Sequence, residues 1–383
     1  MQTVLLLIAA LYNSEKEPSL GSSWGFLTRG LITATLYALG TCPNTVKTHS
    51  PHFVALHCQE VGGKNYEASM MHVDSFIKEL LSSDAMRDFS RARVYLDKNY
   101  KSQEQFTVTK KFKKVVGKEI CSDTLMTSTT LEKEKFPQHY FPDCKWSRKG
   151  FIRTRWALAD CVFDLVNIHL FHDASNLVAW EKSPSVYSVT RQKALGYALD
   201  RISDQRYEKV PYFIFGDFNF RLDSKRVIES LCSTATMQTV RVDGTNEADK
   251  LIFRESDNDH KVVLQLEKKL FNYINQDVFR ENNGTRLLEF DKELSVFKDR
   301  LHELGISFPP RAKCPQYHSE IRVNPLVTRS ESEEKSITYD NMGPNVCMGD
   351  HKPVYLYFRL TFGAGKHANK HKCEWCQRLE KIS

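Results

Sequence analysis

The sequence of 383 residues lacks several features that would place it in a specialised class of protein. No run approaches the roughly 18 apolar residues of a membrane-spanning helix, and no segment repeats at a fixed period. The net charge of +7 is too moderate for a histone-like binder, although its sign is compatible with an anionic substrate, an anionic membrane surface or nucleic acid. With 41% hydrophobic and 26% charged residues, the chain reads as an ordinary soluble globular protein.

A disulfide framework is also missing. Ten cysteines are scattered along the chain, and several lie in apolar runs, as Cys161 does before Val162. This usage indicates reduced, buried thiols and a cytoplasmic protein. The apolar run at residues 4–11 has no basic residues before it, and a first core strand explains it as well as a signal segment does.

Hydrophobic patterns along the chain predict alternating strands and helices, which favours layered α/β architecture. The expected strands are 51–58, two neighbours within 155–171, 211–216 and 353–360, and the expected helices are 67–82, 191–202 and 261–274.

The composition changes after Phe362, so we expect one domain over 1–362 and a flexible basic tail over 363–383. The tail contains residues able to bind a metal, at spacings too compressed for a known zinc site, and a disordered end is the favoured interpretation. These residues are His367, His371, Cys373 and Cys376.

Polar side chains follow the predicted strands, where layered α/β proteins build active sites. Glu60 follows the strand 51–58, and a carboxylate there suits Mg²⁺, which prefers oxygen and takes one or two protein carboxylates. His169 ends the second central strand and can donate to a phosphoryl oxygen. Taken singly, a solvated acid and a satisfied histidine at a sheet edge are the alternatives.

The strongest motif is Gly-Asp-Phe-Asn-Phe-Arg-Leu at residues 216–222. Gly216 allows a sharp turn after the strand. Asp217 and Asn219 are two residues apart and point the same way from an extended segment. An aspartate can orient or deprotonate a water, and an asparagine can hold a phosphoryl oxygen. The alternative, a turn rich in Asp and Asn, is disfavoured by the aromatic strand before it and by the continuation through Arg221.

Two further groups carry charge near predicted strands. Asp350 and His351 precede the last strand, and an Asp–His pair fixes an imidazole tautomer and raises its basicity, although the partners need not be adjacent in sequence. The run 145–155 holds five cations around Gly150, which fits either a polyphosphate clamp or a solvated basic hairpin.

In this order, these motifs resemble the inositol polyphosphate 5-phosphatase family of the DNase I-like superfamily. The segments 62–67, 148–156 and 171–177 look like the type I branch of that family. The similarity covers roughly residues 46–310 and 327–360.

The resemblance implies Mg²⁺-dependent hydrolysis of the 5-phosphate of inositol 1,4,5-trisphosphate and 1,3,4,5-tetrakisphosphate, which terminates inositol phosphate and calcium signalling. It implies a four-layer α/β sandwich of two packed β-sheets flanked by helices. By the same resemblance, Glu60 is expected to be the metal ligand, and Asp217, Asn219, His169, His351 and Asp350 the catalytic residues. Arg148, Lys149 and Arg221 are expected to bind substrate. We expect a cytoplasmic monomer that binds no nucleic acid and associates at most weakly with the plasma membrane.

The sequence departs from the family pattern in places. The family's first strand ends in an asparagine near the metal, whereas Ile8-Ala9-Ala10 stands here and Asn13 is out of step. A Pro-x-Trp-Cys-Asp-Arg segment is replaced by residues 311–320, the segment near 106–114 is shortened, and no C-terminal Cys-a-a-X box is present. Two alternatives therefore stay open: a catalytically silent protein that binds inositol phosphates, and a nuclease of the same superfamily.

Overall fold

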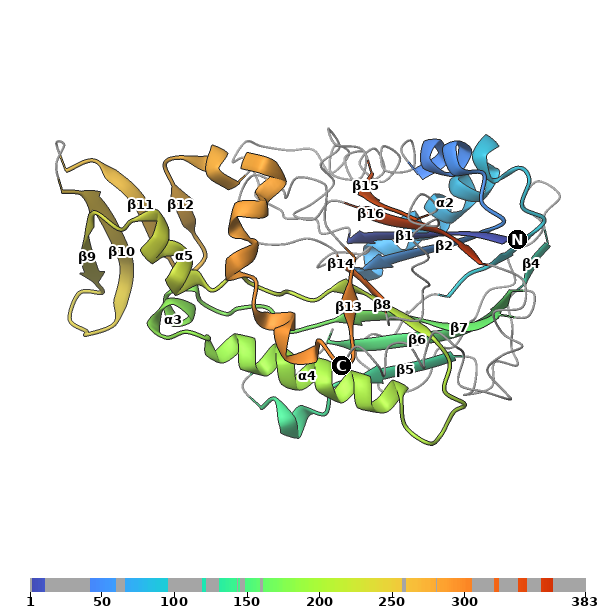
Figure 1. The fold of residues 1–383 in the computed structure, drawn as a ribbon, viewed down its shortest axis with the longest axis horizontal. Coiled ribbons are helices and arrows are strands. Elements are labelled where there is room, and N and C mark those ends of the chain that lie inside the picture. The colour runs from blue at the N-terminus through green and yellow to red at the C-terminus, as the bar shows by residue number, and fades with distance from the viewer. Residues whose placement is uncertain are drawn as a thin grey trace, which may run out of the picture.

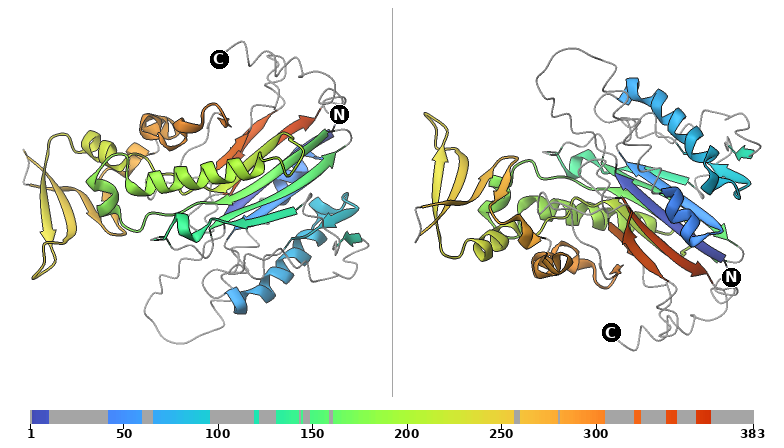
Figure 2. Two further views of the ribbon diagram at one scale, coloured as in Figure 1. Left: turned by 90° about the horizontal axis from the view of Figure 1, so that it is seen from below. Right: turned by 90° about the horizontal axis from the view of Figure 1, so that it is seen from above.

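Two β-sheets packed face to face form the centre of the computed structural model, and helices lie over their outer faces (Figure 1, Figure 2). The structure describes residues 2–10, 42–59, 66–95, 119–121, 131–142, 144, 149–158, 161–256, 260–279, 281–304, 320–323, 337–342 and 353–360. The four-layer arrangement expected from the sequence is confirmed.

The larger sheet has the order β13-β14-β8-β7-β6-β5. β7 is antiparallel to β6 and parallel to β8, and β8 is buried along its whole length. A continuous apolar run of this kind is typical of a strand covered on both faces. The bounds are β5 Leu131–Lys135, β6 Gly150–Leu158, β7 Cys161–His169, β8 Tyr212–Asp217, β13 His302–Glu303 and β14 Glu320–Val323.

The smaller sheet has the order β15-β16-β1-β2. Its strands are β1 Gln2–Ala10, β2 Phe53–Gln59, β15 Thr338–Asn341 and β16 Val354–Leu360. β1 pairs with β2 and β16, which confirms the strand interpretation of the apolar run near the N-terminus. Phe163 and Phe215 of the larger sheet pack against Leu356 and Phe358 of the smaller one, and this contact forms the central core.

Helices cover the two outer faces. α4 (Val186–Ile202) lies on the larger sheet and packs Leu195 and Leu199 against that sheet's Ile168 and Ile214. On the smaller sheet, the helix at residues 42–49 shares a core with side chains of β2 and β16, and Leu80 of α2 (Tyr66–Ser82) packs against it. Both predicted helices, 67–82 and 191–202, are confirmed. Within the described part of the chain, every helix is too short or too polar to cross a membrane.

A third sheet, ordered β12-β11-β10-β9, lies at one end of the molecule beside α3 and α5 (Figure 1). The prediction of a helix over 261–274 is wrong, because this segment is the hairpin β11–β12. Leu264 and Leu266 of β11 alternate toward the core, and Lys268 and Lys269 form the turn. The bounds are α3 Asn176–Glu181, α5 Ser224–Leu231, β9 Ala235–Arg241, β10 Ala248–Glu255, β11 Val262–Glu267 and β12 Phe271–Tyr273.

Short elements complete the described chain. β3 (Arg91–Arg93) pairs in parallel with β4 (Glu119–Cys121). The 3-10 helices are Asp84–Met86, Gln138–Tyr140, Gln276–Phe279, Glu281–Phe290 and Glu293–Phe297.

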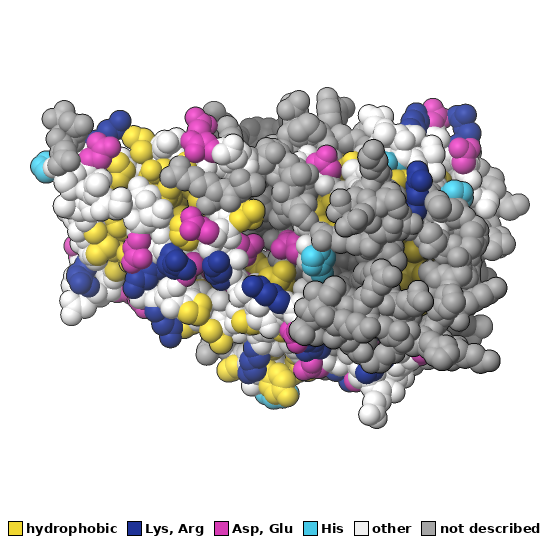
Figure 3. Space-filling view, in the orientation of Figure 1, with side chains coloured by type: hydrophobic (Ala, Val, Ile, Leu, Met, Phe, Trp, Pro, Cys, Tyr) yellow, Lys and Arg dark blue, Asp and Glu magenta, His cyan; other side chains and the backbone are white. Residues whose placement is uncertain are grey.

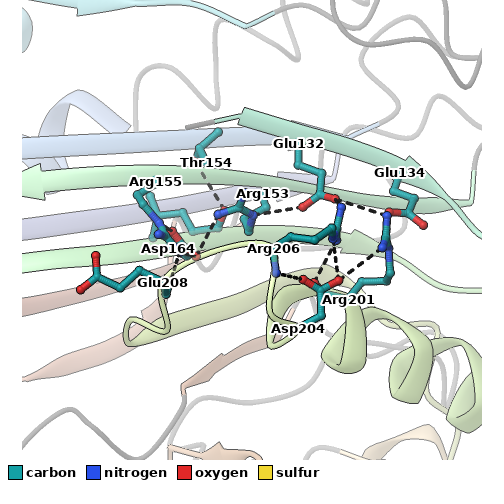
Figure 4. A network of polar contacts seen from close by, with 11 residues as sticks. Glu132, Glu134, Arg153, Thr154, Arg155, Asp164, Arg201, Asp204, Arg206 and Glu208 are labelled. Atoms are coloured by element: carbon teal, nitrogen blue, oxygen red, sulfur yellow. Dashed lines mark hydrogen bonds and ion pairs between the residues drawn. The ribbon is translucent and has the colours of Figure 1, made fainter. Parts of the chain in front are cut away.

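An ion-pair network ties β5, β6 and β7 to the end of α4 and the loop after it (Figure 4). Arg153 is fully buried, with Nε 3.2 Å from Glu132 Oε2 and Nη1 3.3 Å from Asp164 Oδ2. Arg155 donates to both oxygens of Asp164, at 2.8 and 2.9 Å. The clamp interpretation of the basic run is therefore wrong for Arg153 and Arg155, which form ion pairs within the fold.

Candidate active site

Three strand ends of the larger sheet meet at one edge. β7 and β8 are parallel, and their last residues, His169 and Asp217, are register partners. β6 runs antiparallel to β7 and pairs Gly150 with His169, so Lys149 arrives at the same edge just before β6 begins. The topology therefore brings together three polar side chains from distant parts of the sequence.

Lys149, His169 and Asp217 form a buried polar group. Lys149 Nζ lies 2.7 Å from His169 Nε2, and Asp217 Oδ2 lies 3.4 Å from the same nitrogen. The three residues are 6%, 9% and 7% exposed, so little water screens their charges. An ammonium only donates, so Nε2 accepts when Lys149 is charged and the imidazole is neutral. A protonated imidazole would instead direct its N–H toward Asp217. The proton beside Nε2 is therefore carried by Lys149 in the first arrangement and by His169 in the second.

Gly216 makes the close approach of these strands possible. Its φ is +131°, which side chains rarely allow. A Cβ at this position would lie 2.1 Å from the carbonyl oxygen of Ile168 and 2.6 Å from Gln59 Nε2. The prediction that the strand stops and turns at Gly216 is wrong, because Gly216 lies inside β8 and the turn follows at Asp217–Asn219. Glycine is required here for its positive φ and for the space that the neighbouring strand takes.

Asp217 and Asn219 meet through a turn, and the prediction of an extended segment is wrong. Asn219 has φ +51°, and its backbone N–H donates to Asp217 Oδ1 over 2.9 Å. This bond is the signature of a turn closed by an aspartate side chain. Asn219 Nδ2 also donates to the Leu170 carbonyl at 3.0 Å, which anchors the turn to the chain leaving β7.

A buried ionic network lies behind this turn. Arg191 of α4 donates through Nε and Nη2 to the two oxygens of Glu293, at 2.8 and 2.6 Å, and through Nη1 to Asp173. Glu293 Oε1 also accepts the backbone N–H of Arg221 at 3.1 Å. The side chain of Arg221 extends this series of contacts, because its Nη2 lies 3.4 Å from Asn219 Oδ1. The network connects α4 to the Asp217 turn.

Sequence reasoning missed Arg191, Glu293 and Asp173. Two signals were available: Asp173 lies in the segment 171–177 that resembles the type I branch, and Arg191 is a charged side chain on the apolar face of a predicted helix, where a buried charge requires a partner.

The electrostatics of the site favour anions. Burial lowers the pKa of Arg221 to about 9, and the guanidinium therefore stays charged at neutral pH. Partial burial, followed by the charges of Lys149, Lys269 and Arg221, lowers the pKa of His172 to about 4. His172 is thus neutral near pH 7 and lies among cations.

The last residue of β2, Gln59, contacts the same edge of the larger sheet and offers an oxygen ligand. Gln59 Nε2 donates to Asn167 Oδ1 at 2.5 Å and to the Ile168 carbonyl at 2.8 Å, which orients the amide. Its buried Oε1 has no hydrogen-bond partner among the described residues. An oriented amide oxygen next to Glu60 fits a hard cation such as Mg²⁺. The described residues alone contain no group of three or more metal-binding His, Cys, Asp or Glu side chains.

Of the nine predicted site residues, the structure brings five together and does not describe the other four; the functional roles of all nine stay predictions. Those that meet at the sheet edge or in the turn are Lys149, His169, Asp217, Asn219 and Arg221. Those that lie outside the described residues are Glu60, Arg148, Asp350 and His351.

Comparisons with known proteins reveal closely similar relatives. The chain is 67% identical over 368 residues to inositol polyphosphate-5-phosphatase A of Homo sapiens, covering 86% of this chain and 89% of the relative. It is 30% identical over 424 residues to a probable type I inositol 1,4,5-trisphosphate 5-phosphatase of Caenorhabditis elegans, covering 93% and 99%. No family model matches the chain.

Solved structures are more distant. The inositol polyphosphate 5-phosphatase domain of SPsynaptojanin, in complex with inositol (1,4)-bisphosphate and calcium ion, aligns with a TM-score of 0.44 and 12% identity, covering 100% of this chain and 91% of that one.

Proposed function

The chain belongs to the inositol polyphosphate 5-phosphatase family, and from this premise we propose that it hydrolyses the 5-phosphate of inositol 1,4,5-trisphosphate and inositol 1,3,4,5-tetrakisphosphate. The observation that carries the proposal is the buried group of Lys149, His169 and Asp217 at one sheet edge. Such a group suits phosphoryl transfer, which depends mainly on positioning and charge neutralisation.

In the proposed reaction, water forms a bond to phosphorus while the bond from phosphorus to the ring oxygen breaks, and the ring oxygen takes up a proton and leaves as a hydroxyl group. Asp217 orients the water and takes its proton. Lys149 was expected to bind substrate; in this proposal it pairs with His169, and the pair faces the charge that develops on the phosphoryl oxygens. Asn219 fixes the carboxylate of Asp217 through its backbone N–H.

The remaining predicted residues keep their roles in the proposal: Glu60 as metal ligand, His351 and Asp350 as catalytic residues, and Arg148 and Arg221 as substrate-binding residues. Gln59, with its oriented amide oxygen, joins Glu60 as a candidate ligand by chemistry. These residues would hold Mg²⁺, which would supply neutralising charge to the phosphate. We also propose that the domain spans 1–362 and acts as a cytoplasmic monomer, with at most weak contact with the plasma membrane.

Phosphate release from inositol 1,4,5-trisphosphate, measured with and without Mg²⁺, tests the proposal. We expect Mg²⁺-dependent release by the native chain and a loss of roughly 100-fold or more in Asp217→Asn. Asp249→Asn, the same change at an exposed carboxylate on β10, should leave the rate unchanged. Tight binding of the substrate without turnover would favour the silent binding protein, and release of nucleotide fragments from DNA would favour the nuclease.

A further inference from the structure

The turn between β11 and β12 is fastened to the loop that follows His169. The backbone N–H of Asn176 donates to the Lys268 carbonyl at 3.0 Å, and Asn176 Nδ2 donates to the Glu267 carbonyl at 3.2 Å. Lys269 Nζ donates to the Asp173 carbonyl at 2.8 Å. The third sheet therefore reaches the candidate active site through a turn held by both main-chain and side-chain bonds.

Asp173 places Lys269 close to the residues of the site. The backbone carbonyl of Asp173 accepts a hydrogen bond from Lys269 Nζ, and the carboxylate oxygen Oδ2 of Asp173 lies 3.8 Å from Arg221 Nε. Asp173 itself is buried, whereas His172 and Lys269 on either side of it are exposed. Lys and Arg side chains form a band on the face of the molecule between the third sheet and the centre (Figure 3).

The imidazole of His172 reaches solvent but is partly buried, and it belongs to the residue just before Asp173, whose carbonyl accepts a hydrogen bond from Lys269 Nζ. After burial, the strongest influences on its pKa are Lys149, Lys269, Arg221 and His169. An imidazole in such surroundings stays neutral and can still donate one hydrogen bond to an oxygen anion.

We propose that Lys269 and His172 bind a phosphate group of the inositol polyphosphate that is not cleaved. This inference rests on the proposed function and deepens it by assigning the third sheet a part in substrate selection. Lys149 is 6% exposed and the side chain of Arg221 is 11% exposed, so both belong to the buried reacting end of the site. Lys269 is an exposed cation that its bond to the Asp173 carbonyl fixes beside that end, where a second phosphate of the same ring would lie.

The test compares Lys269→Ala and His172→Ala with the control Lys268→Ala. The control removes an exposed lysine from the same turn and keeps the carbonyl that accepts from Asn176. For inositol 1,4,5-trisphosphate with Mg²⁺, we expect KM to rise roughly tenfold or more in Lys269→Ala and less in His172→Ala, because loss of a charge-assisted hydrogen bond weakens binding. The value of kcat should change little, since this contact is the same in the ground and transition states. Lys269→Arg should restore most of the lost affinity.

A second measurement separates this inference from the proposed function. Calorimetric binding of inositol 1,4,5-trisphosphate in the presence of a metal chelator should weaken roughly tenfold in Lys269→Ala and stay unchanged in Lys268→Ala. A native chain without turnover would refute the proposed hydrolysis, while the calorimetry would still decide the role of Lys269. If Lys269→Ala binds as the native chain does, or if kcat falls while KM stays constant, the assignment is wrong.

Discussion

Replacing Arg191 with methionine should destabilise the protein more than any change at a single one of its partners. The guanidinium is fully buried and donates to Glu293, to Asp173 and, at 3.3 Å, to the Phe171 carbonyl. Its loss leaves the carboxylates of Glu293 and Asp173, 5% and 7% exposed, without their main cation. Removal of one partner from a buried ion pair costs about 3–5 kcal/mol, and we expect Arg191→Met to reach the upper end of that range.

Glu293→Gln should cost less, about 3 kcal/mol, because Asp173 still faces the guanidinium and an amide oxygen can still accept from Arg221. The double variant Arg191→Met with Glu293→Leu should be less destabilised than the sum of the single changes by roughly 1–3 kcal/mol, since no charge then remains at position 293.

Urea denaturation followed by tryptophan fluorescence measures these free energies of unfolding. The rate of phosphate release, measured without urea, should fall in the double variant, because an aliphatic side chain in place of Glu293 cannot accept the N–H of Arg221. The reasoning is refuted if Arg191→Met lies within about 1 kcal/mol of the native protein, a range typical of surface substitutions, or if Glu293→Gln costs more than Arg191→Met.

Three further predictions follow from single contacts. Lys149→Met should lower kcat roughly 100-fold with a smaller change in KM, because the ammonium of Lys149 lies 2.7 Å from His169 Nε2. The control Lys298→Met, on the exposed surface, should change neither constant, and an effect of Lys149→Met on KM alone would contradict the prediction. Gly216→Ala should lower the free energy of unfolding, measured by urea titration, by about 3 kcal/mol or more, because φ is +131° and the new Cβ would meet the Ile168 carbonyl. The control Gly244→Ala, with φ +76° and open space around the position, should lower it by about 1 kcal/mol. Burial lowers the pKa of His57 to about 4, so the folded state favours the neutral imidazole. The stability that the neutral imidazole contributes is complete above about pH 6.5, the pKa in the unfolded chain, and is lost as the pH falls toward 4. At about pH 5 this loss should be roughly 1–2 kcal/mol, and His57→Phe should lack it; an equal pH dependence in both proteins would exclude His57 as its source.

The strands that carry the site could be predicted from the sequence because each apolar run stops at a polar residue. His169 and Asp217 end β7 and β8 in this way, and Gly216 has the positive φ expected of a glycine, although β8 continues to Asp217 before the chain turns. The parallel pairing that makes the two residues neighbours depends on the whole sheet and not on either strand.

The supporting network could not be predicted in the same way. Arg191 and Glu293 are separated by 102 residues, and neither lies in a recognisable motif. The hairpin β11–β12 was misread because Val262, Leu266 and Leu270 recur at helical spacing, while Leu264 and Leu266 also alternate as strand residues do. Pairing with β10 decided between the two patterns.

The bonds that hold the β11–β12 turn link the candidate active site to the local stability of the third sheet. The third sheet has its own hydrophobic core, built from β10, β11, α5 and the 3-10 helices near 276–290. Structural units of this kind often open together in amide hydrogen exchange, at a lower free energy than global unfolding. Opening of this unit would break the bonds from Asn176 and Lys269 while β7 and β8 stay paired. Exchange protection at Asn176 should therefore follow that of β11, and the fraction of time that this unit is closed would limit how often the Lys269 side of the site is complete.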